Sequence, residues 1–276
     1  MKTIGVLTSG GDAQGMNAAV RAVVRTCVAE NITVMGIREG YKGLIEGNIQ
    51  ELTARDVCDI LGRGGTFLRS ARCPEFKTEE KIQEAVHTCK EFGIEGIVVI
   101  GGDGSFRGAR DLTLHGIPCV AMPGTIDNDI VCSDYTIGFD TAGNICIDLI
   151  DKLRDTCNSH NRCSVVQIMG KNAGWVTLEA GIAAGATSII VPEVEFDFQR
   201  DIVDRIARGK RYGKNHFIVL VSEGLFFDVP SNKNYKYCVD NGIANIADFA
   251  KRVEKETGVE SREAILGHVQ RGGAPS

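Results

Sequence analysis

The sequence predicts an α/β fold with two lobes, each built on a mainly parallel sheet between two layers of helices. Short apolar runs rich in Val and Ile alternate with amphipathic helical patterns along the chain. This alternation is typical of doubly wound parallel sheets. The 276 residues suit two lobes, since most domains span about 100–150 residues. We expect residues 1–140 to form the first lobe and 141–258 the second, with 259–276 returning to the first.

The first lobe begins with an apolar strand, a glycine-rich turn and a helix over 16–30, whose apolar residues recur at helical spacing. A second amphipathic helix is expected over 78–92. Thr78 and Lys81 give it half a capping box, and Glu79 and Glu80 suit its first turn. The strands expected in this lobe are 3–7, 32–37, 96–100 and 118–122.

In the second lobe, a helix is expected over 142–157 and is followed by apolar strands separated by helical patterns. The polar, turn-rich stretch over 229–242 predicts a surface loop. The strands expected here are 163–169, 187–192 and 216–224.

Composition excludes several classes of function. The net charge of −5 and the aromatic content of 6% disfavour nucleic acid as a partner. No apolar run approaches the roughly 18 residues that a membrane span needs, and the N-terminus is too short in apolar residues for a signal peptide. The ten cysteines form no C-x-x-C pair, and several fall within apolar patterns, as expected for core residues. We therefore expect a cytoplasmic protein without membrane contact. The core candidates are Cys27, Cys89, Cys119 and Cys146.

Glycine-rich or acidic turns follow the predicted strands, where open parallel sheets bind ligands. Glycines bring backbone N–H groups close to phosphate, and the N-terminus of the next helix adds a favourable dipole. Asp103, within "GGDGS", could hold a magnesium ion against phosphates. One such turn is common in α/β proteins, but several in order favour phosphate binding. The chain lacks both the P-loop and the G-x-G-x-x-G patterns.

The stretch "PGTIDND" over 123–129 places Asp127 and Asp129 two residues apart at a strand end. Neither strand nor helix propensity accounts for two such carboxylates. A helix cap, a metal site and a base aimed at a substrate are all compatible with this pattern taken alone.

A series of motifs in this order resembles the bacterial ATP-dependent 6-phosphofructokinases. They are "GVLTSGGDAQGMNAA", "GGTFLRSARCPEF", "VVIGGDGS", "PGTIDNDI", "IGFDTA", "LRDT" and "LGHVQRGG". The resemblance implies the two-lobed phosphofructokinase fold, usually as a homotetramer. It also implies magnesium-dependent transfer of the γ-phosphoryl group of ATP to the 1-hydroxyl of fructose 6-phosphate in glycolysis.

The resemblance also assigns roles to residues of this sequence. Asp127 would be the base on the sugar hydroxyl, Asp129 would support it, and Thr125 would meet the transferred phosphoryl group. Arg72 and Lys171 would supply positive charge, and Asp103 would bind Mg²⁺. The ATP site would comprise Gly11, Arg72, Cys73, Gly102, Asp103, Gly104, Ser105 and Gly108.

The sugar phosphate would bind a larger set, in which Arg162 and Arg262 would come from a neighbouring subunit. Its members are Thr125, Ile126, Asp127, Arg162, Met169, Gly170, Lys171, Glu223, Arg262, His268, Val269, Gln270 and Arg271. An effector site for ADP or phosphoenolpyruvate is implied as well. Its candidates are Arg21, Arg25, Arg55, Arg154, Gly185, Arg211, Lys214 and His216.

Two glycines bear on the phosphoryl donor. The resemblance implies that pyrophosphate-dependent relatives carry an aspartate at position 104 and a lysine at 124, whereas this chain has Gly104 and Gly124. A side chain at either position would crowd or recharge the space for the α-phosphate of ATP, so ATP is the expected donor.

The chain departs from the family pattern in several places. Lys171 stands where arginine is usual, Ala54 stands where an effector arginine is expected, and Thr187 replaces a glutamate. Residues 229–242 are an insertion, and the chain stops at "QRGGAPS", so we expect a truncated C-terminus. The alternatives are an inactive fragment or phosphometabolite-binding protein, a pyrophosphate-dependent phosphofructokinase, and another kinase with a "GGDG" loop.

Overall fold

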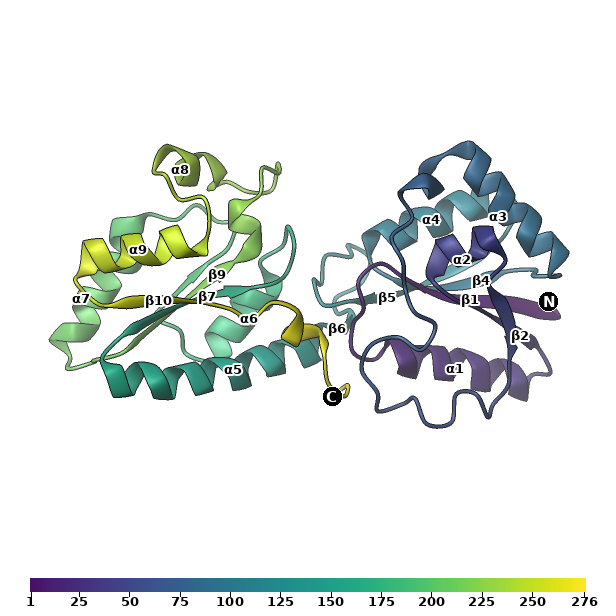
Figure 1. Cartoon of the computed structure of the whole chain (residues 1–276), viewed down its shortest axis with the longest axis horizontal. Helices are drawn as coiled ribbons and strands as arrows, with labels where there is room; N and C mark the ends of the chain where they lie inside the picture. Colours follow the sequence, from purple (N-terminus) through teal and green to yellow (C-terminus); the bar gives the residue numbers. More distant parts are fainter. The chain divides into compact units, whose positions relative to one another are not determined.

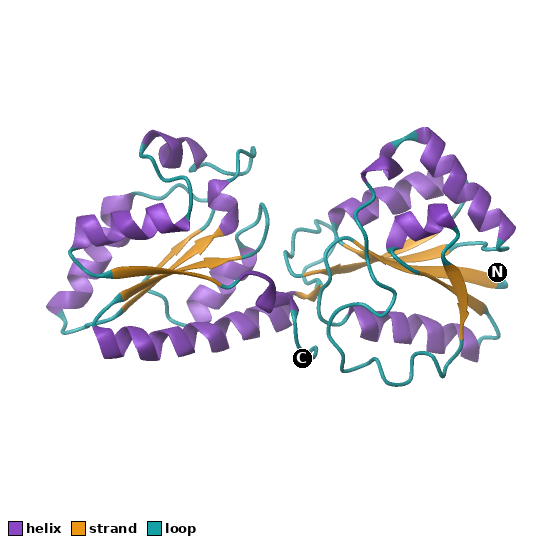
Figure 2. Cartoon of the chain, in the orientation of Figure 1, coloured by secondary structure: helices purple, strands orange, loops and turns teal.

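The computed structural model describes all residues, Met1–Ser276. It divides into two compact units: unit 1 comprises Met1–Asp140 with Arg271–Ser276, and unit 2 comprises Thr141–Gln270. Both units are three-layer α/β structures, as predicted (Figures 1 and 2). None of the helices combines the length and apolar character that crossing a membrane requires.

Unit 1 contains a six-stranded sheet in the order β3-β2-β1-β4-β5-β6. All neighbouring strands are parallel except β2 and β3, which pair antiparallel. Helix α1 covers one face, and α2, α3 and α4 cover the other (Figure 1). The strands are β1 (Thr3–Ser9), β2 (Thr33–Ile37), β3 (Ile49–Leu52), β4 (Ile97–Gly101), β5 (Cys119–Thr125) and β6 (Ile137–Gly138). The helices are α1 (Met16–Ala29), α2 (Gly40–Glu46), η1 (Pro74–Lys77), α3 (Glu79–Glu91) and α4 (Asp103–Leu114).

Unit 2 contains a four-stranded parallel sheet in the order β10-β7-β9-β8. Its larger core lies between the sheet and α7, α8 and α9, around Phe198, Phe217 and Phe249. The strands are β7 (Cys163–Ile168), β8 (Ser188–Ile190), β9 (Phe217–Ser222) and β10 (Ser261–Ile265). The helices are α5 (Phe139–His160), α6 (Trp175–Ala183), η2 (Gln199–Val203), α7 (Asp204–Arg211), η3 (Glu223–Phe226), α8 (Tyr235–Asp240), α9 (Ile246–Thr257) and η4 (Gly267–Arg271).

The predicted strands and helices all occur, with ends shifted by a few residues. The Thr78 side chain caps α3 by accepting a hydrogen bond from the backbone N–H of Lys81, as the half capping box predicts. Strand β3 and helix α2 were not predicted. Strand β3 has only four residues, and half of them are exposed.

The C-terminal region differs from the prediction in two ways. Residues 259–276 were expected to return to the first lobe, but β10 within them pairs with β7 of unit 2. Of residues 259–276, only Arg271–Ser276 belong to unit 1. The loop predicted over 229–242 contains the short helix α8, whose Cys238 is buried against the core of unit 2.

Candidate functional site

The turn between β4 and α4 presents backbone rather than side chains. Gly101 has no room for a side chain, since a Cβ atom there would stand 2.4 Å from the Ser9 carbonyl oxygen. The carbonyl of Gly102 accepts hydrogen bonds from the N–H groups of Ser105 and Phe106 and starts the helix. A Cβ atom on Gly104 would meet nothing within 4 Å. The start of α4 is thus an open helix N-terminus, which suits a phosphate group.

Asp103 lies in the first turn of α4 and is about half exposed, with Arg107 Nη2 2.9 Å from its Oδ2. The structure contains no group of three or more His, Cys, Asp or Glu side chains that could hold a metal ion. One exposed carboxylate beside a phosphate-binding turn nevertheless fits Mg²⁺, because this ion is usually bound by one or two carboxylates, substrate phosphates and water. The donor set suits a nucleotide-held magnesium ion rather than a protein cage.

The "PGTIDND" turn lies beside this loop, because β4 and β5 are paired with Gly101 opposite Pro123. A Cβ atom on Gly102 would stand 3.6 Å from Thr125 Cβ. Thr125 ends β5 and is 9% exposed, and its Oγ1 accepts a hydrogen bond of 3.1 Å from the backbone N–H of Asp127. The expected phosphoryl contact and the expected base are therefore joined within one turn.

Asn128 fixes the shape of this turn, a role that the sequence analysis missed. Its φ of 51° lies in the left-handed region, where asparagine is enriched. The Nδ2 group donates to the Asp134 carbonyl at 3.2 Å, and Oδ1 accepts from the Thr136 N–H at 3.0 Å. The middle residue of "DND" is thus structural. Asp127 and Asp129 on either side are half-buried, and Ile126 is 1% exposed.

The two glycines associated with the phosphoryl donor differ in their surroundings. Gly124 is buried, and a Cβ atom there would stand 3.0 Å from Ile100 Cγ2 and 3.3 Å from Met16 Cε. Core packing is therefore enough to explain glycine at 124. Gly104 faces open space, so it is the residue whose side chain would enter the ligand region.

Other members of the expected ATP set have different surroundings. Arg72 is exposed. Cys73 is half-buried, and burial, followed by the Glu75 carboxylate, raises the pKa of its thiol. Gly108 is buried against Tyr41, whose ring carbons would stand 2.5 Å from a Cβ atom at 108. The Tyr41 hydroxyl donates to the Ser105 carbonyl at 2.5 Å, so packing of Tyr41 explains glycine at this position.

Arg271 was expected to bind the sugar phosphate, but it lies in unit 1 against the first glycine-rich turn. Its Nη1 would be 2.5 Å from a Cβ atom on Gly11 and is 3.7 Å from Asp12 Oδ1. Gln14 Nε2 donates to the Gly272 carbonyl at 2.9 Å. The structure thus places this arginine beside an expected ATP residue.

Asn17 was also missed, and it joins α1 to the loop that carries Arg72. Its side chain is 3% exposed. Nδ2 donates to the carbonyls of Arg63 and Gly64 at 3.1 and 3.3 Å, and Oδ1 accepts from the Phe67 N–H. A buried asparagine in a helix otherwise spaced as apolar was the available signal.

In unit 2, a tight loop follows β7 and carries Lys171. The backbone of Lys171 has a φ of 54°, and its side chain is exposed. Glu223 Oε1 accepts hydrogen bonds from the N–H groups of Gly170 and Lys171 at 3.2 and 2.7 Å. Met169 N–H donates to Gln270 Oε1 at 2.9 Å. Four expected sugar-phosphate residues, together with Lys171, thus lie within one network.

Arg162 and Arg262 contact the same carboxylate. Arg162 Nε is 2.9 Å from Glu260 Oε2, and Arg262 Nη2 is 2.6 Å from Glu260 Oε1. The two arginines approach because β10 pairs with β7, with Arg262 opposite Ser164. The Arg162 hydrogen bond and charge, and the Arg262 charge, lower the pKa of Glu260. The result is a pair of cations, Arg162 half-buried and Arg262 exposed, that suits an anionic ligand. His268 and Val269 lie exposed on the neighbouring η4.

Part of the expected effector set also gathers in unit 2. Burial and the charge of Arg154 lower the pKa of Lys214, and burial, Lys214 and Arg154 lower that of His216. Arg154 donates to the Ala184 carbonyl, next to Gly185. Thr187 Oγ1 accepts from the Ile218 N–H at 3.3 Å. The remaining candidates lie apart from this group: Arg211 is exposed at the end of α7, and Arg21, Arg25 and Arg55, with Ala54, belong to unit 1.

Comparisons with known proteins identify the family and the fold. A family model described as Phosphofructokinase matches residues 3–276. The chain is 53% identical to the ATP-dependent 6-phosphofructokinase of Bacillus velezensis and 54% identical to that of Bacillus pumilus. Each alignment covers all of this chain and 81% of the relative.

Solved structures are similar as well. A phosphofructokinase structure from Saccharomyces cerevisiae aligns with a TM-score of 0.86 and 34% identity, over 100% of this chain and 39% of the other. A pyrophosphate-dependent phosphofructokinase from Nitrosospira multiformis aligns with a TM-score of 0.79, over 98% of this chain and 70% of the other. At 20% identity, the second likeness concerns the fold alone.

Proposed function

The chain belongs to the phosphofructokinase family, and we infer that it is an ATP-dependent 6-phosphofructokinase. It transfers the γ-phosphoryl group of ATP to the 1-hydroxyl of fructose 6-phosphate and forms fructose 1,6-bisphosphate and ADP. One observation of the structure supports this reaction best: the open N-terminus of α4 lies beside the turn that joins Thr125 to Asp127.

Asp127 acts as the general base. Its carboxylate takes the proton of the 1-hydroxyl while that oxygen forms a bond to the γ-phosphorus, and the bond from this phosphorus to the β–γ bridging oxygen breaks to release ADP. Phosphoryl transfer depends mainly on positioning and charge neutralisation, so a base that the turn holds at a fixed place suits this chemistry. A positioned base typically contributes about 10²–10⁴-fold, and Asp129 supports it from the same turn.

The phosphates of ATP are bound by backbone N–H groups of Gly102 and Gly104 at the start of α4, because the Ser105 N–H already donates to the Gly102 carbonyl. Arg72 is exposed and free to turn toward the nucleotide. Mg²⁺ supplies neutralisation of phosphate charge when it is bound, and Asp103 is the residue that would hold it. Thr125 contacts the transferred group.

Fructose 6-phosphate is recognised by residues of unit 2, of which Arg162 and Arg262 come from a neighbouring subunit. Arg162 and Arg262 share Glu260, and a phosphate would replace that carboxylate as their partner. Lys171 provides a further charge, but it lacks the two-pronged geometry of arginine. Glu223 and Gln270 hold the backbone of the Lys171 loop. His268 is exposed and stands two residues before Gln270.

The proposal extends to regulation by an effector and to self-association. Arg154 and Lys214, with the imidazole of His216 beside them, form a cationic group that suits an anionic effector such as ADP or phosphoenolpyruvate. Trp175, Leu178 and Ile182 are exposed apolar residues of α6, which supports self-association, as in a homotetramer. The ten free cysteines fit a reducing cytoplasm.

The test is a product assay with fructose 6-phosphate and either ATP or pyrophosphate, with and without magnesium. Magnesium-dependent formation of fructose 1,6-bisphosphate from ATP is expected. Turnover with pyrophosphate alone would instead support the pyrophosphate-dependent alternative. Nucleotide binding without turnover from either donor would support a binding protein. For the effector group, Arg154→Ala should abolish the response to ADP, and a full response in that variant would refute the assignment.

A further inference from the structure

Residues 229–242 hold two asparagines that are almost fully buried. Asn232 is 9% exposed and Asn234 is 2% exposed, although both lie in a polar stretch predicted to be a surface loop. Buried amides are costly unless they are hydrogen-bonded, so their partners show what the segment holds in place.

Asn232 contacts the short helix η3. Its Nδ2 lies 3.0, 2.7 and 3.0 Å from the carbonyl oxygens of Gly224, Leu225 and Phe227. Its Oδ1 accepts a hydrogen bond of 2.9 Å from the backbone N–H of Asn234. One side chain therefore joins η3 to the start of α8.

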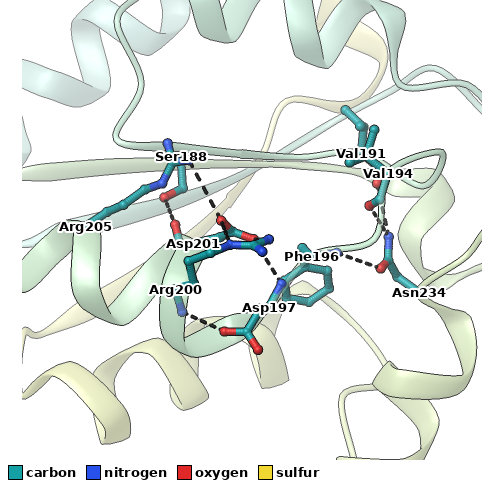
Figure 3. Close-up of polar contacts among 9 residues, drawn as sticks. All are labelled: Ser188, Val191, Val194, Phe196, Asp197, Arg200, Asp201, Arg205 and Asn234. Atoms are coloured by element: carbon teal, nitrogen blue, oxygen red, sulfur yellow. Dashed lines mark hydrogen bonds and ion pairs between the residues drawn. The ribbon is translucent and has the colours of Figure 1, made fainter.

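Asn234 contacts the segment that follows β8 (Figure 3). Its Nδ2 donates to the carbonyls of Val191 and Val194 at 3.2 and 2.9 Å, and its Oδ1 accepts from the Phe196 N–H at 3.1 Å. Between the two asparagines, the Lys233 N–H donates to the Pro192 carbonyl at 3.0 Å. The segment over 191–196 is thus fixed by four hydrogen bonds.

Each of the two segments also carries a carboxylate that shapes the loop with Lys171. Glu223, in η3, accepts from the N–H groups of Gly170 and Lys171. Glu193, after β8, accepts from the N–H of Gly174 at 2.7 Å. The contact is also steric, because a Cβ atom on Gly224 would stand 2.5 Å from the Lys171 carbonyl oxygen.

We propose that Asn232 and Asn234 are positioning residues for the Lys171 loop, and that residues 229–242 therefore set the geometry of sugar-phosphate binding. Asn232 acts through η3 and Glu223, and Asn234 acts through the 191–196 segment and Glu193. The catalytic part of this proposal rests on the proposed phosphotransferase function.

The physical basis is that the two amides hold the segments that carry Glu223 and Glu193. Replacing Asn232 by alanine removes the amide donor from three carbonyls, of which only the Leu225 carbonyl has no backbone donor besides it. Replacing Asn234 removes the donor of the Val191 and Val194 carbonyls. In each case the segment shifts or admits water to satisfy these groups. The carboxylates then move with their backbones, and the N–H groups of residues 170–174 lose their acceptors. A displacement of about 1 Å in a binding group can lower the rate about 100-fold.

The experiment measures steady-state kinetics of Asn232→Ala and Asn234→Ala in the full chain. We expect kcat/KM for fructose 6-phosphate to fall by about ten- to 100-fold, with less than a twofold change in KM for ATP. The control is Asn241→Ala in the same segment, where the amide contacts only Tyr237 and Arg252. This variant should stay within twofold of the wild type. Equal losses for both substrates, or a loss in the control, would overturn the proposal.

A double-mutant cycle separates positioning from general damage to the fold. In a Lys171→Ala background, Asn232→Ala should change kcat/KM by no more than about twofold, because the group that it positions is absent. Additive losses would refute action through the Lys171 loop.

Amide hydrogen exchange tests, without relying on turnover, whether Asn232 and Asn234 hold the Lys171 loop in place. The amides of Gly170, Lys171 and Gly174 should exchange at least tenfold faster in Asn232→Ala or Asn234→Ala than in the wild type and in Asn241→Ala. Unchanged exchange would overturn the proposal even if kinetics change. If the wild type shows no phosphoryl transfer, the proposed function fails. The exchange rates still decide whether the two asparagines hold the Lys171 loop in place. A variant that does not fold would be replaced by Asn232→Ser or Asn234→Ser, which keep one donor.

Discussion

The guanidinium group of Arg271 lies against the backbone of Gly11, with Nη1 2.5 Å from the point where a Cβ atom of residue 11 would stand. The last residues of the chain thus cover the glycine-rich turn after β1. A hydrogen bond of 2.9 Å from Gln14 Nε2 to the Gly272 carbonyl strengthens this contact. No local pattern encodes it, because its partners stand at opposite ends of the sequence.

Gly11→Ala should therefore weaken ATP binding more than it destabilises the fold. The new methyl group would push the flexible Arg271 side chain away from the turn, and we expect KM for ATP to rise severalfold with little change in Tm. Isothermal calorimetry with an ATP analogue would measure the effect. Gly62→Ala is the matched control, because a Cβ atom at 62 meets nothing within 4 Å. Unchanged ATP affinity in Gly11→Ala would contradict the role given to this contact.

Asp127→Asn should lower kcat by about 10²–10⁴-fold while leaving substrate affinities within a few fold. The amide keeps the size of the side chain but cannot accept the proton of the sugar hydroxyl. Single-turnover measurements would separate this chemical step from product release. Asp134→Asn makes the same change of charge at an exposed position nearby and should retain full activity. Near-normal turnover by Asp127→Asn would rule out the assigned base.

The two donor-associated glycines should respond differently to substitution. Gly104→Asp enters open space, so Tm should be nearly unchanged while kcat/KM for ATP falls because of repulsion from phosphate. Gly124→Ala meets Ile100 and Met16 and should cost about 1–3 kcal/mol of unfolding free energy through overpacking. Chemical denaturation and ATP kinetics on both variants test this. A stable Gly124→Ala protein together with an unstable Gly104→Asp protein would contradict the packing argument.

His216 should titrate below the usual histidine range. Burial lowers its pKa from 6.5, and the charges of Lys214 and Arg154 lower it further. Since the unfolded chain binds the proton more readily, the stability that the neutral imidazole contributes is complete above pH 6.5. It is lost progressively as the pH falls from there toward the lower folded pKa. His216→Gln should therefore flatten the decline in unfolding free energy within this window.

The contribution of Lys214 to this shift can be measured by NMR. Lys214→Met should raise the pKa of His216 toward 6.5, but not fully, because burial is the larger cause. Lys210→Met makes the same change of charge on α7, where Lys210 Nζ bonds to the Thr257 carbonyl, and should leave the titration unchanged. A His216 pKa that does not respond to Lys214→Met would remove Lys214 from the cationic group.

Asn17→Ala should destabilise unit 1. It leaves the carbonyls of Arg63 and Gly64 and the N–H of Phe67 without their buried partner, and we expect a loss of about 2–3 kcal/mol. Urea denaturation followed by circular dichroism measures it. Asn215→Ala removes exposed hydrogen bonds to Asn161 and His216 and should change the unfolding free energy by less than about 0.5 kcal/mol.

Much of the fold was predictable because apolar periodicity and glycine punctuation are local signals. Strands β1, β4, β5, β7 and β9 contain apolar runs. The cap of α3 was predictable because Thr78 is a residue type that favours the N-cap position. The family followed from motifs that include "PGTIDND". Strand β10 was not foreseen, since most of its residues are polar or exposed and only pairing with β7 makes them a strand.

The candidate site shows the same limit. Asp127 was singled out because its carboxylate lacked a propensity-based explanation, but Asn128, with its left-handed backbone, is what shapes the turn. Gly108 and Gly124 were interpreted through ATP, whereas Tyr41, Ile100 and Met16 fill the space beside them. A glycine in a sequence does not say which neighbour excludes its side chain.

The sequence alone determined the class of fold, the order of most elements and the family, and it named the residues proposed for the chemistry, because these depend on local pattern and on residue type. Only the tertiary structure decided which distant residues meet. It placed Arg271 over Gly11, joined Arg162 and Arg262 through Glu260, and set Asn232 and Asn234 against the segments that carry Glu223 and Glu193. Such contacts depend on strand pairing and on the hydrogen bonds of buried amides, and these are fixed when the chain closes on itself.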